Sequence, residues 1–163
     1  YEFLSLRPNV ISCHRLMAMG FSEADVISVL KEVFATTDPR LLVGIGDDGA
    51  VIKASTKNLV AATDMAVEGV HFKREWSSLF EIGGKVTAAN LADIYAMGGA
   101  PKYLLVSAGL TPDFGIAEIT ELATGIAAEA ALVGASILAI ICLTAGVKAE
   151  AGLFFHSCFN LSN

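Results

Sequence analysis

Apolar residues with helical spacing mark the first regular element of the chain. They recur along one face of the segment 22–35, at Val26, Ile27, Leu30, Val33 and Phe34. Ser22 stands three residues before Asp25, the arrangement of a capping box at a helix start. The polar residues 36–38 and Pro39 then stop the pattern. The sequence therefore predicts a helix over 22–35.

Shorter apolar runs and two longer periodic segments follow. Runs rich in Val, Leu and Ala predict strands over 41–43, 50–53, 58–64 and 103–110. An alanine-rich stretch predicts a helix over 80–97, ended by Gly98, Gly99 and Pro101. Another apolar stripe predicts a helix over 116–133. This order of elements predicts an α/β or α+β fold, in which a mixed sheet is covered by helices.

Length and charge narrow the class of protein. The chain has 163 residues, about one domain. Eleven Lys and Arg against seventeen Asp and Glu give a net charge of −6, which argues against a general nucleic-acid binder. Three cysteines without a Cys-x-x-Cys pair make a disulfide framework improbable and favour a reducing, cytoplasmic location.

Polar side chains gather at the ends of the predicted elements. They are Asp47 and Asp48 after the first strand, Thr63 and Asp64 after the third, Glu68 and His71 just beyond, and Asn90 and Asp93 within a helix. Mg²⁺ takes oxygen ligands, commonly one or two carboxylates plus water and phosphate oxygens. Positioned ions can neutralise a phosphoryl group during transfer, so no nucleophilic protein residue is required and we expect none.

Each cluster, judged alone, has a simpler interpretation. Asp47 and Asp48 before Gly49 have the composition of a hairpin turn. Asn90 and Asp93, three residues apart, share a helix face that solvent alone would explain. His71 between two apolar residues could be a hydrogen-bonded, half-buried histidine. Spacing by itself leaves these alternatives open.

Taken together, four segments resemble the thiamine-monophosphate kinases in order and spacing. They are GIGDDGA at 44–50, ATDM at 62–65, VEGVHF at 67–72 and NLADIYAMG at 90–98. The resemblance covers about residues 22–137. It implies a fold like the amino-terminal domain of aminoimidazole-ribotide synthetase, whose sheet pairs with a second subunit in a homodimer.

The resemblance also implies a reaction. Enzymes of this family transfer the γ-phosphate of ATP onto thiamine monophosphate, with Mg²⁺ between the substrates, and give thiamine diphosphate. By motif, Asp48, Thr63, Asp64 and Asp93 fall on metal-ligand positions. His71 falls on a position that contacts the thiamine phosphate, and supporting roles fall to three further residues: Asp47, Glu68 and Asn90.

The chain departs from the family in two places. Ala62 stands where many members have a hydroxyl side chain, and Leu138–Leu143 stands where the family has a Gly-Gly-Asp segment. We therefore expect a poorly defined leader at 1–21, a kinase amino-terminal domain at 22–137 and a divergent apolar tail at 138–163, with the family's carboxy-terminal domain absent. A truncation or frame change near Ile137 is one hypothesis for the tail. Activity could be impaired.

Three classes of function follow from these features. The first is the phosphoryl-transfer enzyme, and the second is a nucleotide-binding or dimerisation module without turnover. The third is a membrane-tethered fragment, because 130–147 is uncharged over a length that just reaches a bilayer span. Gly134, Ser136, Thr144 and Gly146 dilute that run, so we expect no membrane span.

Overall fold

The computed structural model describes residues 21–46, 49–53, 55–56, 58–111, 113–144 and 158–161. Within these ranges the order is α1 (Glu23–Val33), β1 (Leu41–Val43), β2 (Val51–Ile52), β3 (Leu59–Ala62), α2 (Leu79–Ala96), β4 (Tyr103–Leu110), α3 (Ile116–Leu132), β5 (Ser136–Thr144) and β6 (Cys158–Leu161). The helices and the first four strands confirm the elements expected from the sequence, to within one or two residues at most ends.

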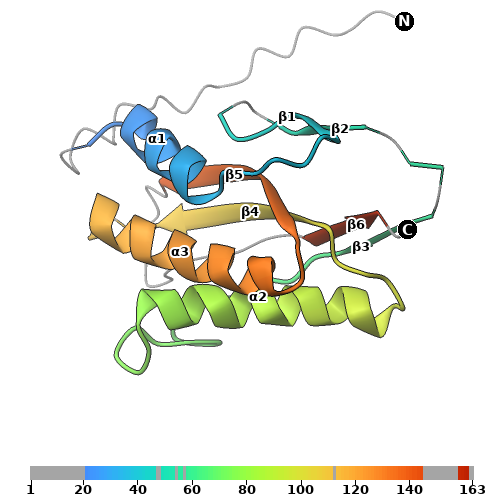
Figure 1. The fold of residues 1–163 in the computed structure, drawn as a ribbon. Coiled ribbons are helices and arrows are strands. Elements are labelled where there is room, and N and C mark those ends of the chain that lie inside the picture. The colour runs from blue at the N-terminus through green and yellow to red at the C-terminus, as the bar shows by residue number, and fades with distance from the viewer. Residues whose placement is uncertain are drawn as a thin grey trace, which may run out of the picture.

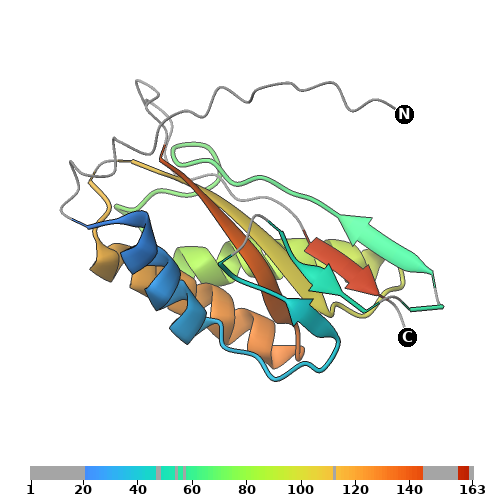
Figure 2. The ribbon, with the colours of Figure 1, turned by 90° about the horizontal axis from the view of Figure 1, so that it is seen from above.

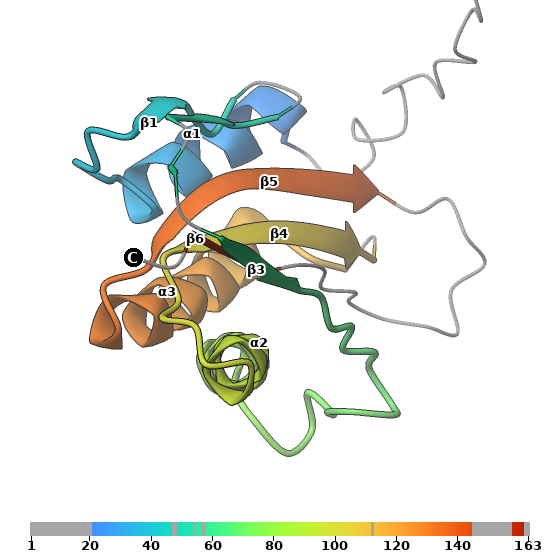
Figure 3. The ribbon, with the colours of Figure 1, turned by 90° about the vertical axis from the view of Figure 1, so that its right-hand side faces the viewer.

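Four strands form a mixed sheet in the order β3-β6-β4-β5. β4 and β5 run parallel and are joined through α3, whereas β6 is antiparallel to both β3 and β4. β1 and β2 form a separate antiparallel pair. Helices α2 and α3 lie side by side against one face of the sheet, and α1 packs on α3 near the β1 and β2 pair (Figures 1 and 3). The expected mixed sheet covered by helices is confirmed.

The core lies between the sheet and the two long helices. β4 shows why: its side chains Leu104, Val106, Ala108 and Leu110 are buried, whereas the alternate positions are half-buried except for Tyr103, which is buried at the strand start. A strand that is covered on one face shows this period of two. The core is completed from the helix side by Ile82 and Ile94 of α2 and by the buried apolar residues of α3. β3 enters this layer at its edge, so the segment that follows β3 is held next to α2.

Local signals set the helix ends. Ser22 and Asp25 form the expected capping box at the start of α1, and Ser78 and Glu81 form a second one at the start of α2. After α2, Gly98 has a φ of 76°, a left-handed conformation that glycine adopts at little cost. The start of α2 is therefore fixed beside the loop that precedes it.

The segment 130–147 does not form one continuous helix where the structure describes it. Its first residues end α3, and after a turn at Val133 and Gly134 the chain continues as β5, which is paired along β4. None of the helices in the described ranges combines the length and apolar composition that crossing a membrane would require. Leu138, placed in the predicted tail, is buried within the sheet. The proposed domain boundaries themselves stay a prediction.

A charged cluster joins the α1–β1 connection to the sheet. Asp38 accepts hydrogen bonds from the Arg40 side chain at 3.2 and 3.3 Å and from the buried Tyr103 hydroxyl at 3.0 Å. The bonds from Arg40 hold the pKa of the Asp38 carboxyl below its ordinary value, although burial acts in the opposite direction. Viewed from above, this connection passes beside the ends of β4 and β5 (Figure 2).

This cluster predicts a pH dependence of stability. Because the folded pKa of Asp38 is lowered, its contribution is complete above the ordinary pKa of about 3.9 and is lost as the pH falls through the lower folded value. Asp38→Asn should therefore reduce the stability at neutral pH and flatten its decline below about pH 4. Tyr103→Phe, which leaves Arg40 in place, should flatten it less. Urea unfolding at a series of pH values measures both, and equal slopes in all three proteins would contradict the assignment.

Candidate functional site

The end of β3 is tied to the middle of α2 by a buried asparagine. Asn90 is 5% exposed, and its Oδ1 accepts the backbone N–H of Asp64 at 3.3 Å. Its Nδ2 donates to the Val86 carbonyl at 2.9 Å, which orients the side chain within the helix. Two of the predicted site residues, 26 positions apart in sequence, are thus brought together. Asn90 sets where the Asp64 backbone lies.

The predicted metal ligands of this region face solvent. Thr63 and Asp64 follow β3 and are exposed, and Asp64 Oδ1 accepts the Met65 N–H at 2.7 Å. Asp93 is exposed on α2, one turn beyond Asn90. Asp47 and Asp48 lie outside the described residues. Within the described ranges, no group of three or more His, Cys, Asp and Glu side chains gathers as a metal cluster.

These carboxylates suit Mg²⁺ better than a transition metal. Mg²⁺ keeps several waters and is bound through one or two carboxylates together with substrate phosphates, so it does not need a closed protein cage. Exposed carboxylates at a strand end and on the adjoining helix meet that requirement. The donor set contains no thiolate or imidazole cluster of the kind that zinc prefers in the described part of the chain.

His71 lies in a tight loop between β3 and α2. The Val67 N–H donates to His71 Nδ1 at 3.0 Å, and Gly69, with a φ of 83°, allows the turn. Because Nδ1 accepts this bond, the neutral ring carries its proton on Nε2. The His71 side chain is exposed, so the Nε2–H is a donor available to a ligand. The alternative of a hydrogen-bonded, half-buried histidine is therefore right about the hydrogen bond but wrong about the burial.

A second contact holds the same loop to the β4–α3 connection. Arg74 Nε donates to Glu68 Oε1 at 2.8 Å, and another guanidinium nitrogen donates to Asp113 Oδ2 at 2.6 Å. The guanidinium also lies over the Phe114 ring, 5.0 Å from its centroid. Glu68, predicted as a supporting residue, thus accepts a hydrogen bond from Arg74. Through Arg74, the loop is also bound to Asp113 of the β4–α3 connection.

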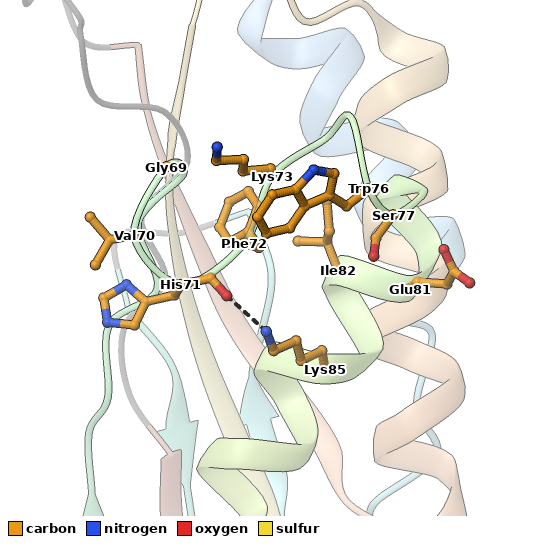
Figure 4. A pocket seen from close by; sticks show the side chains of 10 residues that line it. All are labelled: Gly69, Val70, His71, Phe72, Lys73, Trp76, Ser77, Glu81, Ile82 and Lys85. Atoms are coloured by element: carbon orange, nitrogen blue, oxygen red, sulfur yellow. Dashed lines mark hydrogen bonds between the residues drawn. The ribbon is translucent and has the colours of Figure 1, made fainter.

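A pocket of about 170 Å³ lies between this loop and the first turns of α2 (Figure 4). Its lining residues are Gly69, Val70, His71, Phe72, Lys73, Trp76, Ser77, Glu81, Ile82 and Lys85. Lys85 Nζ donates to the His71 carbonyl at 2.7 Å. The Ser78 amide lowers the pKa of Glu81, which therefore carries a charge at neutral pH. Among the predicted site residues that the structure describes, His71 alone lines this pocket.

Sequence reasoning missed the basic residues around His71. Lys73, Arg74 and Lys85 lie close to His71 in the chain or in space, although the chain has only eleven Lys and Arg in all. That local concentration of positive charge in an acidic chain was a usable signal. Their partners were not predictable from it, because Arg74 and Asp113 are 39 positions apart.

The role of Asn90 can be tested by removing its amide. Asn90→Ala should lower the free energy of unfolding by about 1–3 kcal/mol, since buried hydrogen-bonding groups lose their partner. It should also speed hydrogen exchange of the Asp64 amide. Asp93→Ala, on the exposed face of the same helix, should change stability by no more than about 0.5 kcal/mol. Unchanged exchange at Asp64 in Asn90→Ala would show that the hydrogen bond does not hold this segment.

The chain is similar to curated proteins over only part of the length of those proteins. The thiamine-monophosphate kinase of Mycobacterium tuberculosis is 37% identical over 98 residues, which are 60% of this chain and 29% of that protein. The thiamine-monophosphate kinase of Bacillus subtilis is 43% identical over 84 residues, 51% of this chain and 26% of that protein. The chain therefore spans less than a third of the length of these relatives.

Solved structures agree with the fold. The thiamine-monophosphate kinase of Stenotrophomonas maltophilia K279a has a TM-score of 0.63 at 26% identity, over 85% of this chain and 41% of that chain. AaThiL complexed with AMPPCP and TMP has a TM-score of 0.58 at 25% identity, with the same coverages. The hydrogenase maturation protein HypE of E. coli, with a TM-score of 0.65 at 20% identity, covers 85% of this chain and 42% of that chain and shows the fold alone.

The model of one protein family also matches the chain. The AIR synthase related protein, N-terminal domain, matches residues 46–139. That range runs from the loop after β1 to the first half of β5, so it contains Asp64, the His71 loop and α2. Since it covers more than half of the sequence, the chain belongs to the AIR synthase related protein family and carries that family's N-terminal domain.

Proposed function

We propose that the chain is the amino-terminal half of a thiamine-monophosphate kinase, which transfers the γ-phosphate of ATP to thiamine monophosphate and forms thiamine diphosphate and ADP. The observation that carries the proposal is the hydrogen bond from the Asp64 amide to Asn90. It holds an exposed acidic strand end against α2, which carries Asp93. The likeness to AaThiL complexed with AMPPCP and TMP supports the choice of substrates.

Magnesium would be held by Asp64 and Asp93, with Thr63 and Asp48 as the further ligands inferred from their motifs. When bound, Mg²⁺ would neutralise the charge of the reacting phosphates. The contribution of the protein is to hold the ligand oxygens of these residues in place, through a backbone whose position is already fixed. Asp64 is positioned by the Met65 and Asn90 hydrogen bonds, so its carboxylate does not have to be ordered when the substrates bind.

His71 would bind the phosphate of thiamine monophosphate. The Nε2–H faces solvent because Nδ1 is held by the Val67 amide, and a ring N–H is a suitable donor to a phosphate oxygen. Lys85 fixes the His71 carbonyl and adds positive charge to the same pocket. Phosphate binding there would leave the acidic strand end to the metal ions.

A turnover assay tests the proposal directly. The chain is incubated with ATP, Mg²⁺ and thiamine monophosphate, and thiamine diphosphate is measured by chromatography. The proposal expects product that depends on Mg²⁺ and is lost in Asp64→Asn, with Asp25→Asn, whose carboxylate caps α1, as the matched control. Product formation that is equal in both variants would refute the site, and a folded chain without any turnover would favour the second candidate below.

The second candidate is a nucleotide-binding or dimerisation module without turnover. The observation that favours it is the sequence of β5, Ser136–Thr144, which contains no acidic residue where the kinase resemblance leads us to expect Gly-Gly-Asp. Such a module would bind an ATP analogue with Mg²⁺ but form no product.

We also propose that the protein acts as a cytoplasmic homodimer that does not bind nucleic acid. The net charge of −6 supports the last part, because phosphate backbones select positive surfaces. Light scattering of the purified chain tests the dimer, and a single monomeric mass over a wide range of concentrations would contradict it.

A further inference from the structure

Trp76 is a large aromatic side chain that the fold leaves 75% exposed beside the His71 pocket. Its ring already carries a cation, because Lys73 Nζ lies 4.7 Å from the ring centroid. An ammonium group over an indole face is attracted by the negative π-electron density of the ring, and tryptophan gives the strongest attraction of this kind. The face of Trp76 thus has the properties of a cation-binding surface.

The pocket next to this ring is large enough for one aromatic ring. Its volume is about 170 Å³, and a cavity of about 150 Å³ in another protein holds benzene. Val70, Phe72 and Ile82 give it apolar walls. All of its lining residues come from the segment 69–85, so a single copy of this chain forms it.

Charge is distributed unevenly around the pocket. His71 and Lys85 lie together on one side, joined by the hydrogen bond to the His71 carbonyl, whereas Lys73 and Trp76 lie on the other (Figure 4). The first side offers N–H donors and positive charge, which suit an anionic group. The second offers an aromatic face, which suits a positively charged ring. A ligand that is anionic at one end and a cationic aromatic at the other would match both.

We infer that Trp76 is the specificity-determining residue of this pocket and that its face stacks against a cationic aromatic ring, a place that the Lys73 ammonium holds in the free protein. The inference rests on the proposed function, because the thiazolium of thiamine monophosphate is such a ring and its phosphate is the anionic end.

Binding would then be an exchange of cations on one face. The incoming thiazolium takes the place of the Lys73 ammonium, which keeps three N–H donors and a flexible stem. The released ammonium remains in the pocket, where it can pair with the phosphate of the same ligand. Lys73 therefore disfavours a thiazolium that lacks a phosphate and favours one that carries it.

Intrinsic fluorescence reports on this exchange, because Trp76 is the chain's sole tryptophan. The whole chain is titrated with thiamine, with thiamine monophosphate, with inorganic phosphate and with the neutral thiazole alcohol that corresponds to half of thiamine. We expect saturable quenching by the first two and none by inorganic phosphate. The neutral thiazole should bind at least about 2-fold more weakly than thiamine, because it lacks both the positive charge and the aminopyrimidine ring.

Variants separate the ring face from general packing, with calorimetry as the readout that does not need the indole. Trp76→Leu should weaken thiamine binding by about 2-fold to 30-fold, and Trp76→Phe should restore part of it. Leu132→Ala, at a site that is 77% exposed at the end of α3, is the matched control and should bind like the parent. Lys73→Gln should bind thiamine at least as tightly as the parent but thiamine monophosphate less tightly.

The outcomes distinguish this inference from the proposed function. Quenching by thiamine without any binding of an ATP analogue would support the ring site and count against the kinase. Binding of the analogue with Mg²⁺ but linear, unsaturable quenching equal to that of free N-acetyltryptophanamide would overturn the ring site and leave the kinase standing. Equal affinity of Trp76→Leu and the parent for thiamine would also overturn it.

Discussion

Gly125→Ala should destabilise the protein by about 2–4 kcal/mol, because the new methyl group has no room at the crossing of α2 and α3. A Cβ at Gly125 would overlap the backbone carbonyl oxygen of Phe80, and a Cβ at Gly83 would overlap that of Leu122. Backbone atoms within a helix cannot move aside as a side-chain end can. The two helices would have to separate, and the core between them and β4 would loosen.

Gly84→Ala is the matched control for this change. Gly84 lies in the same helix as Gly83, but its nearest neighbour to an added Cβ is the Gly125 carbonyl oxygen at 3.9 Å, an ordinary contact. With that space, alanine should stabilise the helix by about 0.5–1 kcal/mol. Urea unfolding followed by circular dichroism measures both variants. Similar stabilities of Gly125→Ala and Gly84→Ala would contradict the close helix crossing.

Asp64→Asn should weaken Mg²⁺-dependent binding of an ATP analogue at least about tenfold, since changing even the partners of metal ligands carries that cost. The amide keeps the size of the side chain and can still accept the Met65 N–H, so the fold should be retained. Only the negative charge available to the metal is lost. Calorimetric titration at fixed Mg²⁺ gives the affinity.

Asp25→Asn is the control for Asp64→Asn because it removes the same charge from a distant place. Asp25 accepts the Ser22 N–H in the α1 capping box, outside the region around β3 and α2. Its affinity for the analogue should equal that of the parent. If both substitutions weakened binding alike, the effect would come from net charge and the assignment of Asp64 would fail.

Local signals explain why so much of the fold could be predicted. Each of these signals acts within a few residues. The capping box at Ser22 marks the start of α1, the glycine after α2 marks the end of that helix, and the apolar stripe marks α3. β5 was harder to predict. Its run Ser136–Thr144 is apolar between its two end residues, and such a run does not by itself distinguish a buried strand from a buried helix. β6 depends on pairing with β3 and β4 far back in the chain.

In the candidate site, too, the residue types could be predicted from the sequence but the long-range contacts could not. The residue types at Asp64, His71 and Asn90 were recognisable from motifs, but the hydrogen bond from Asp64 to Asn90 spans 26 positions and depends on how β3 packs against α2. The tautomer of His71 follows from a backbone contact that no sequence pattern specifies. The position of the Lys73 ammonium over the Trp76 ring likewise depends on how the loop folds. Assigning Asp48, Thr63, Asp64 and Asp93 to metal ligation stays a prediction.

We propose that the exposed acidic end of β3 holds a magnesium nucleotide, and the first measurement to make is calorimetric titration of the whole chain with AMPPCP, with and without Mg²⁺. We expect saturable binding that requires Mg²⁺ and that is followed by binding of thiamine monophosphate. A folded chain that bound no nucleotide, or bound it equally well without Mg²⁺, would refute the proposal.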